Sequence, residues 1–223
     1  MENVERALAS LRSGGFVVLF DSGEREGEAD ILMSASSATA ARVSKIRNFG
    51  GGLVCVAIGK KACDSLGLPF IADVMMKTSG ISKNLILKRA KYGDKSAFSV
   101  SVNHKDAFTG VTDIDRAKTM RELGKIVEKA GNTGISLASS FASSFKAPGH
   151  VQLLRSSGLC NRKGHTELST ELAQLAGIAP AVVLCEMLDG KSGKAASISK
   201  AKAIAKKLQA PFISGKQVME ALE

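Results

Sequence analysis

Residues 16–33 read FVVLFDSGEREGEADILM, and this stretch decides how the chain folds. Its two apolar runs, 16–20 and 31–33, have the composition of buried strands. Between them, residues 21–30 hold five carboxylates, one arginine and two glycines. Because glycine tolerates tight turns, we predict two strands joined by a loop that aims several carboxylates at one point.

Apolar runs of the same kind return at 53–58 and 181–186. Neither alternates with polar residues, which is typical of strands buried on both faces. Helical patterns separate the strands, so we predict an α/β (α+β) fold with helices on both faces of a sheet. Helices are predicted over 2–13, 38–48, 60–66, 115–130, 166–176, 196–208 and 214–222, and further strands over 30–34, 96–102 and 151–155.

Two stretches lack a clear pattern. Residues 69–95 combine proline, glycines and basic residues without periodicity, and we predict a mobile loop or small insert there. The stretch 136–145 is ambiguous between helix and strand. No repeat, heptad or linker divides the chain, so residues 1–223 are predicted to form one domain.

Composition is that of a soluble globular protein, with 44% hydrophobic and 23% charged residues. No apolar run approaches the roughly 18 residues of a membrane span, and the charged N-terminus lacks the apolar core of a signal peptide. The four cysteines form no Cys-x-x-Cys pair, which favours a reduced compartment over a zinc site or disulfide framework. We expect a cytoplasmic protein with no membrane partner.

The net charge of +10 is concentrated in two segments, 83–95 and 191–223. Such segments suit a nucleic-acid surface, ordinary solubility, or a field that steers a phosphorylated metabolite. Aromatic residues make up only 4% of the chain and tryptophan is absent. Since single-stranded nucleic acid usually stacks its bases on aromatic rings, this composition argues against a nucleic-acid partner.

Three carboxylates of the acidic segment, Glu26, Glu28 and Asp30, are spaced by two residues. In an extended segment they would share one face. Clustered oxygen ligands beside Arg25 suit a hard divalent cation and an anionic substrate. The alternative is a solvated hairpin tip, because runs of charge usually lie on the surface.

A second group of candidate site residues is RKGHT at 162–166, directly before the predicted helix 166–176. Basic side chains, a glycine and a hydroxyl at a helix N-terminus make a good phosphate cradle, because backbone N–H groups and the helix dipole favour an anion there. The simpler alternatives are that Thr166 is a plain helix cap and that His165 is a surface or core histidine.

Glu186 ends the apolar run 181–186. A carboxylate near a buried strand tends to have a raised pKa and can accept a proton, although it could equally face water. The chain contains no P-loop, no Gly-x-Gly-x-x-Gly after a strand and no Gly-x-Ser-x-Gly, so nucleotide and serine hydrolysis lack their usual motifs.

Taken together, these motifs resemble the 3,4-dihydroxy-2-butanone 4-phosphate synthase family of riboflavin biosynthesis. The resemblance rests on DSGEREGEAD at 21–30, TGVTDIDR at 109–116, APGHV at 147–151, RKGHTE at 162–167, and LAG at 175–177 followed by VLCE at 183–186. The motifs stand in the family's order and span residues 16 to about 190. Each is weak alone, but the combination is specific.

The resemblance implies conversion of D-ribulose 5-phosphate to 3,4-dihydroxy-2-butanone 4-phosphate and formate. It implies Mg²⁺ (or Mn²⁺), two ions per active site, held by Glu26 and His165, and it implies proton transfer by His150 and Glu186. The substrate contacts that carry over are Arg25, Glu26, Glu28, Asp30, Thr112, Arg162, Lys163, Gly164, His165, Thr166 and Glu186.

The resemblance further implies a three-layer sandwich around a mixed, twisted sheet. It implies a homodimer with the active site at the subunit interface, so that His165 of one subunit could face Glu26 of the other. Lys163 departs from the family pattern, where a small residue is common, and the stretch between His150 and His165 is slightly short. No second catalytic region follows, so we expect a monofunctional enzyme.

Two other functions stay open at this point. The basic segments would suit a module that binds RNA or nucleotides. The acidic and basic motifs would also suit a different Mg²⁺-dependent sugar-phosphate enzyme, such as an isomerase. Formate release separates the synthase from both, since only the synthase loses one carbon.

Overall fold

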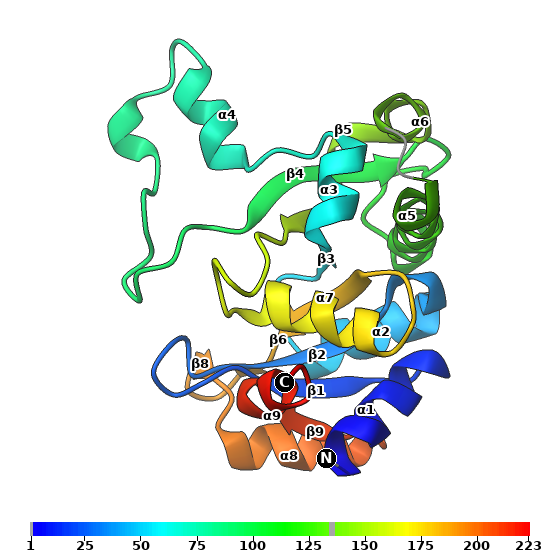
Figure 1. Ribbon diagram of the computed structural model, residues 1–223, viewed down its shortest axis with the longest axis vertical. Helices are drawn as coiled ribbons and strands as arrows, with labels where there is room; N and C mark the ends of the chain where they lie inside the picture. Colours follow the sequence, from blue (N-terminus) through cyan, green and yellow to red (C-terminus); the bar gives the residue numbers. More distant parts are fainter. Residues whose placement is uncertain (1, 134–136) are drawn as a thin grey trace.

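The computed structural model describes residues 2–133 and 137–223 and contains a seven-stranded mixed sheet (Figure 1). In spatial order its strands are β4 (Phe98–His104), β5 (Phe145–Arg155), β3 (Cys55–Ile58), β6 (Ala181–Glu186), β2 (Ala29–Ser34), β1 (Val17–Phe20) and β9 (Phe212–Ser214). The β3–β5 and β1–β9 pairs are parallel and the other four pairs are antiparallel. The predicted α/β class and mixed sheet are confirmed.

The stretch 16–33 forms the two expected strands, β1 and β2, and they pair antiparallel. Every residue of β2 is buried. Its side chains alternate between the two hydrophobic cores: Ile31 and Met33 enter one, and Leu32 enters the other. Both faces of the sheet are covered by other parts of the protein, and this explains why the apolar runs do not alternate with polar residues.

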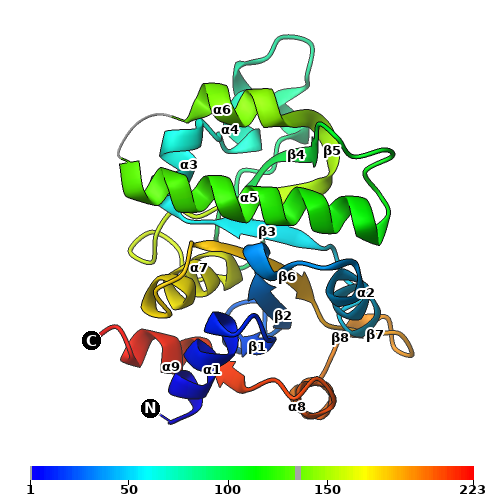
Figure 2. The ribbon, with the colours of Figure 1, turned by 90° about the vertical axis from the view of Figure 1, so that its right-hand side faces the viewer.

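Helices cover the sheet in two layers, as Figures 1 and 2 show. One core packs beneath α2 (Ala40–Phe49), α3 (Lys60–Leu66), α5 (Asp113–Thr133) and α8 (Ile198–Lys207), with α6 (Ala138–Ser144) beside them. The opposite core packs beneath α1 (Glu2–Arg12), α7 (His165–Leu175) and α9 (Gly215–Glu220). The helices and the sheet between them make three layers.

The strand β9 was not predicted, and it is only three residues long. It lies beside β1, with Val18 opposite Phe212. The chain then turns into α9 at Gly215, where a Cβ atom would lie 2.9 Å from the carbonyl oxygen of Asp21. The C-terminal part of the fold therefore supports the strand that leads into the acidic loop.

Other boundaries differ for local reasons. The cap of α2 is Thr39, which accepts the N–H of Arg42, whereas Ala35–Ser37 form a 3-10 turn. The ambiguous stretch 136–145 contains α6, and Ser136 lies outside the described residues. A small hairpin, β7 (Leu188–Asp189) with β8 (Lys194–Ala195), was not expected.

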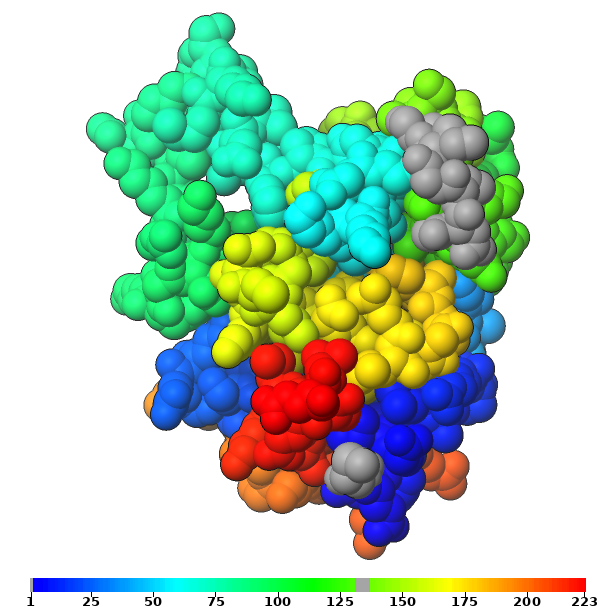
Figure 3. All heavy atoms as spheres, viewed as in Figure 1, coloured from blue at the N-terminus to red at the C-terminus, as the bar shows by residue number. Residues whose placement is uncertain are grey.

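Residues 69–95 form an arm that leaves the body of the protein and returns to it. The arm contains α4 (Ile71–Lys77) and a 3-10 turn at Lys83–Leu85, so it is not without structure. In Figure 3 the green end of the arm, where the chain returns to the body, lies against the blue surface of the acidic loop between β1 and β2. Among the helices in the described part of the chain, none has the length and apolar character needed to cross a membrane.

Candidate functional site

The acidic loop between β1 and β2 winds around the side chain of Asp21. One carboxylate oxygen of Asp21 accepts the backbone N–H of Glu26 at 3.1 Å, and the other accepts that of Glu28 at 3.1 Å. Gly27 closes the turn with a φ of 67°. The segment is therefore a tight loop, as its glycines suggest, and not the extended strand in which Glu26, Glu28 and Asp30 would share one face, because its backbone N–H groups turn inward to the Asp21 carboxylate.

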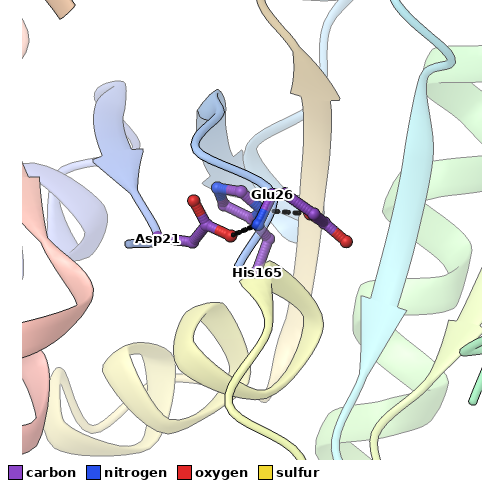
Figure 4. Close-up of side chains that lie close together, drawn as sticks. All are labelled: Asp21, Glu26 and His165. Carbon is purple, nitrogen blue, oxygen red and sulfur yellow. Dashed lines mark hydrogen bonds and ion pairs between the residues drawn. The ribbon is translucent and has the colours of Figure 1, made fainter. Parts of the chain in front are cut away.

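His165, the first residue of α7, lies against this loop, as Figure 4 shows. Its Nδ1 donates to Glu26 Oε2 at 3.2 Å, and its Nε2 donates to the backbone oxygen of Glu28 at 3.2 Å. Asp30 Oδ1 is 3.7 Å from the same Nε2. His165 and Glu26 of one chain thus meet directly, which corrects the expectation that they face each other across subunits.

The electrostatics of His165 follow from these contacts. Burial lowers the pKa of the imidazole, but the charges of Asp30 and Glu26 and the hydrogen bond to Glu26 outweigh it and raise the pKa to about 9. Burial raises the pKa of Glu26, yet the hydrogen bond from His165, with Tyr92 and the charge of Arg25 nearby, lowers it to about 2. The Glu26–His165 pair is therefore an ion pair at neutral pH.

The remaining carboxylates repel one another. Asp30 lies directly opposite Glu186 in the β2–β6 register, a placement that is destabilising for like charges. Burial raises the pKa of Asp30 to about 7; the charge of His165 opposes this shift and that of Glu186 adds to it. Burial and the charges of Glu26 and Glu186 also raise the pKa of Glu28. A cation placed here would relieve this repulsion.

The donor atoms fit a divalent metal. One ligand atom each from Asp21, Glu26 and His165 lies within 4.8 Å of the others, and Asp30 Oδ1 is buried without a hydrogen-bond partner. Carboxylate oxygens with one imidazole suit Mg²⁺ or Mn²⁺. Both oxygens of Asp21 accept backbone N–H groups, so Asp21 holds the loop in shape. Glu26 and His165 remain the ligands that the family resemblance implies, and His165 would give up one ring proton to bind a metal, since both of its nitrogens donate hydrogen bonds here.

The guanidinium groups of Arg25 and Arg162 meet beside Gly164, next to the carboxylate cluster. A Cβ atom at Gly164 would stand 2.4 Å from Arg162 Nη1 and 2.6 Å from Arg25 Nη2, so only glycine lets both guanidinium groups approach. Arg162 Nη1 donates to the buried carboxylate of Glu167 at 2.5 Å, and Arg25 Nη1 lies 3.0 Å from Glu26 Oε2. Burial lowers the pKa of Arg25, but its carboxylate neighbours raise it further.

A cavity of about 270 Å³ opens beside this pair of arginines. Its lining comprises Arg25, Tyr92, Asp94, Leu159, Cys160, Asn161, Arg162 and Lys163. Lys163 is exposed, whereas Thr166 is buried inside the first turn of α7. The helix cap is Gly164, so Thr166 is not the plain cap that the alternative interpretation required. A larger hollow of about 760 Å³, lined by parts of α1, α8 and β9, contains none of the predicted site residues.

Glu186 reaches the same area from the end of β6. Its Oε2 accepts the backbone N–H of Leu53 at 2.9 Å. His150, by contrast, is exposed on β5 and pairs with Asn103, whose amide donates to His150 Nδ1 at 3.2 Å. Thr112 is exposed and accepts the N–H of Asp115 at the start of α5. None of the described contacts joins His150 or Thr112 to the carboxylate cluster of this chain.

Several residues of the site were missed as site residues in the sequence. Asp21 and Glu167 stand inside motifs that carry the family resemblance, but neither was assigned a role. Asn103 had no signal, because its role depends on its contact with His150. Tyr92 and Asp94 belong to the patternless stretch 69–95, and only the fold brings them to the acidic loop.

Comparison with known proteins bears on the whole chain. The profile of the 3,4-dihydroxy-2-butanone 4-phosphate synthase family matches residues 5–221. The proteins of that name from Methanosarcina mazei and Archaeoglobus fulgidus are each 43% identical, over 99% and 97% of this chain and 91% and 92% of their own. A crystal structure described as this synthase with two magnesium ions is 26% identical with a TM-score of 0.75, covering 99% of this chain and 96% of that one. The chain therefore belongs to the 3,4-dihydroxy-2-butanone 4-phosphate synthase family, enzymes of riboflavin biosynthesis.

Proposed function

We propose that this enzyme converts D-ribulose 5-phosphate to 3,4-dihydroxy-2-butanone 4-phosphate and formate with the help of Mg²⁺ or Mn²⁺. The observation that carries the proposal is the meeting of Glu26 and His165 at 3.2 Å beside the guanidinium groups of Arg25 and Arg162. One end of this site suits a cation and the other an anion, as a sugar phosphate bound through metal requires. Residues 1–223 act as a single domain in this proposal, and a cytoplasmic location remains a prediction.

Glu26 and His165 would hold the metal. The similar crystal structure of a synthase with two magnesium ions supports a pair of ions. The chemistry that bound divalent ions supply is stabilisation of negative charge on the substrate oxygens. Asp21 keeps Glu26 in position through the loop backbone. Glu28 and Asp30 add negative charge and acceptor oxygens toward the substrate hydroxyls.

The phosphate would lie against Arg162, Arg25 and Lys163, which line the cavity. The backbone N–H groups of the first turn of α7 add donors there, because Gly164 provides no side-chain cap that would use them. Thr166 lies in that turn. Glu167 fixes Arg162 from beneath, so its guanidinium is positioned before a substrate arrives.

Glu186 would take and return the proton on carbon during enolisation, loss of water, the skeletal shift and the release of formate. Its neighbours suit this role, since it lies opposite Asp30 at the edge of the carboxylate cluster. His150 is the second candidate for proton transfer. Asn103 donates to its Nδ1, so a neutral His150 ring carries its proton on Nε2.

His150 and Thr112 lack contact with the cluster of their own chain, so we propose that they complete the site of a second subunit. The surface beside Thr112 supports a homodimer, because Phe108 is 96% and Ile114 72% exposed there. Apolar side chains so exposed and so close together are typical of a surface that another molecule covers.

The test is incubation with ribulose 5-phosphate and Mg²⁺, followed by quantification of formate and product mass. We expect formate in equal amount to the four-carbon product and loss of turnover with a chelator. A product of unchanged mass would indicate an isomerase instead. Absence of formate, together with tight salt-dependent RNA binding, would overturn the enzyme proposal in favour of a binding module.

The role of Glu186 has a separate test. Glu186→Gln should abolish turnover while substrate binding persists, because the amide keeps the shape but cannot accept the proton. Glu128→Gln, on the exposed face of α5, is the matched control and should leave the rate unchanged. A near-normal rate for Glu186→Gln would remove Glu186 from proton transfer.

A further inference from the structure

The returning end of the arm, residues 90–95, docks onto the acidic loop. The turn is tight: Ala90 N–H donates to the backbone oxygen of Asp94 at 2.8 Å, and Gly93 has a φ of 93°. Asp94 Oδ2 accepts from Arg25 Nε at 2.8 Å and lies 3.6 Å from Arg162 Nε. One carboxylate oxygen therefore stands between the two guanidinium groups of the cavity.

Tyr92 makes a second contact two residues earlier. Its hydroxyl lies near the Glu26 carboxylate, whose charge adds to burial in raising the pKa of Tyr92. The Arg25 guanidinium stacks over its ring, 4.8 Å from the ring centre. The turn at residues 90–95 therefore lies against both ends of the site: against Glu26, where a metal would bind, and against Arg25, where an anion would bind.

Asp94 does not satisfy the arginines. Arg25 Nη2 and Arg162 Nε are both buried without a hydrogen-bond partner. A single carboxylate oxygen cannot supply all the acceptors that two guanidinium forks require, whereas a phosphate group with three oxygens can. The unpaired donors of both side chains thus favour a larger anion than the one that Asp94 provides.

The arm is also weakly attached. Between residues 70 and 95, only Ile86 is buried. Segments that bury few apolar side chains open at low cost. Release of residues 90–95 therefore loses little beyond the contacts of Tyr92 and Asp94 themselves.

We propose that Asp94 is an internal stand-in for the anionic group of the substrate. It holds Arg25 and Arg162 in place while the site is empty, and an incoming phosphate displaces it and moves Tyr92 away from Arg25 and Glu26. Asp94 thus sets the affinity of the site for phosphate esters. The inference rests on the proposed function for the nature of the ligand.

The chain offers a direct reporter, because Tyr92 is its single tyrosine and it has no tryptophan. Tyrosine emission therefore follows the arm alone. A phenol held beside a carboxylate is quenched, so we expect the emission of the wild-type protein to rise as inorganic phosphate is titrated in and Tyr92 moves away from Glu26. Calorimetry of the same titration gives the affinity.

Asp94→Asn should bind inorganic phosphate about fivefold more tightly, the gain expected when a partly exposed competing ion pair is removed. Its emission without phosphate should already exceed that of the wild type. Asp73→Asn, on the exposed part of α4, is the matched control and should change neither value.

Weaker phosphate binding by Asp94→Asn would overturn the proposal, because Asp94 would then be part of the binding site and not its competitor. So would a wild-type protein that binds no phosphate, or binds it with unchanged Tyr92 emission. None of these readings needs turnover. If Tyr92 emission rises with phosphate but no formate forms, the proposed reaction is refuted and the role of Asp94 stands. If formate forms but Tyr92 emission does not change with phosphate, the role of Asp94 is refuted and the reaction stands.

Discussion

Gly164→Ala tests the anion end of the site most sharply. Gly164 has a φ of −93° and a ψ of 176°, which alanine adopts without strain. The effect is therefore confined to the new methyl group, which would lie 2.4 Å from Arg162 Nη1 and 2.6 Å from Arg25 Nη2. Contact of carbon with nitrogen needs about 3.4 Å, so the guanidinium groups must move by roughly 1 Å.

A shift of that size is larger than a hydrogen bond tolerates. Loss of one charge-assisted bond to phosphate costs about 1.5–3 kcal/mol, or roughly 10- to 150-fold in affinity. Folding should suffer less, about 1 kcal/mol, because alanine is a poorer cap than glycine and the arginine tips are flexible. We therefore expect a raised KM with nearly normal stability.

The assays are KM for ribulose 5-phosphate, calorimetry with inorganic phosphate, and urea unfolding. Gly190→Ala is the control, because a methyl group there meets no atom within 4 Å. A KM within about twofold of wild type, with folding intact, would refute the assignment of the two arginines to phosphate binding.

Three further changes test the metal end, the titration and the core. Glu26→Gln should raise the Mg²⁺ concentration needed for half-maximal rate while phosphate binding persists; an unchanged requirement would exclude Glu26 as a ligand. In the absence of metal, the unfolding free energy should fall as the pH rises from 6.5 to about 9. The pKa of His165 is about 9 in the folded state and about 6.5 in the unfolded state, so its contribution to stability is complete below pH 6.5 and is lost as the pH rises through 9. His165→Asn should remove this pH dependence, as measured by urea unfolding. Leu172→Ala, at a fully buried position of α7, should cost about 2–5 kcal/mol in urea unfolding, against less than about 0.5 kcal/mol for the exposed Leu222→Ala.

The strands of the central sheet could be predicted because burial on both faces leaves uninterrupted apolar runs such as 181–186. The pattern gave no such help for β9, whose three residues owe their strand geometry to pairing with β1. The start of α2 was predicted at residue 38 but lies at Ala40 for a similar reason: the sequence offers Ser36, Ser37 and Thr39 as caps close together, and only the 3-10 turn at Ala35–Ser37 decides among them.

The site divides in the same way. Glu26 and His165 are separated by 139 positions, and local patterns cannot join them; the family resemblance supplied the pairing. The loop between the strands was predicted, but the role of Asp21 at its centre was not, because spacing alone does not reveal that its carboxylate accepts the backbone N–H groups of the loop. The contacts of Asp94 depend on an arm that folds back over the loop.

The place of β9 beside β1 has a consequence for synthesis. As the nascent chain leaves the ribosome, β1 emerges early, but its outer edge stays unpaired until Phe212 and its neighbours follow. Gly215 then closes onto Asp21, around which the acidic loop is wound. Cotranslational folding can therefore build the middle of the sheet before β9 pairs with β1, and until then the open edge of β1 can pair with other chains.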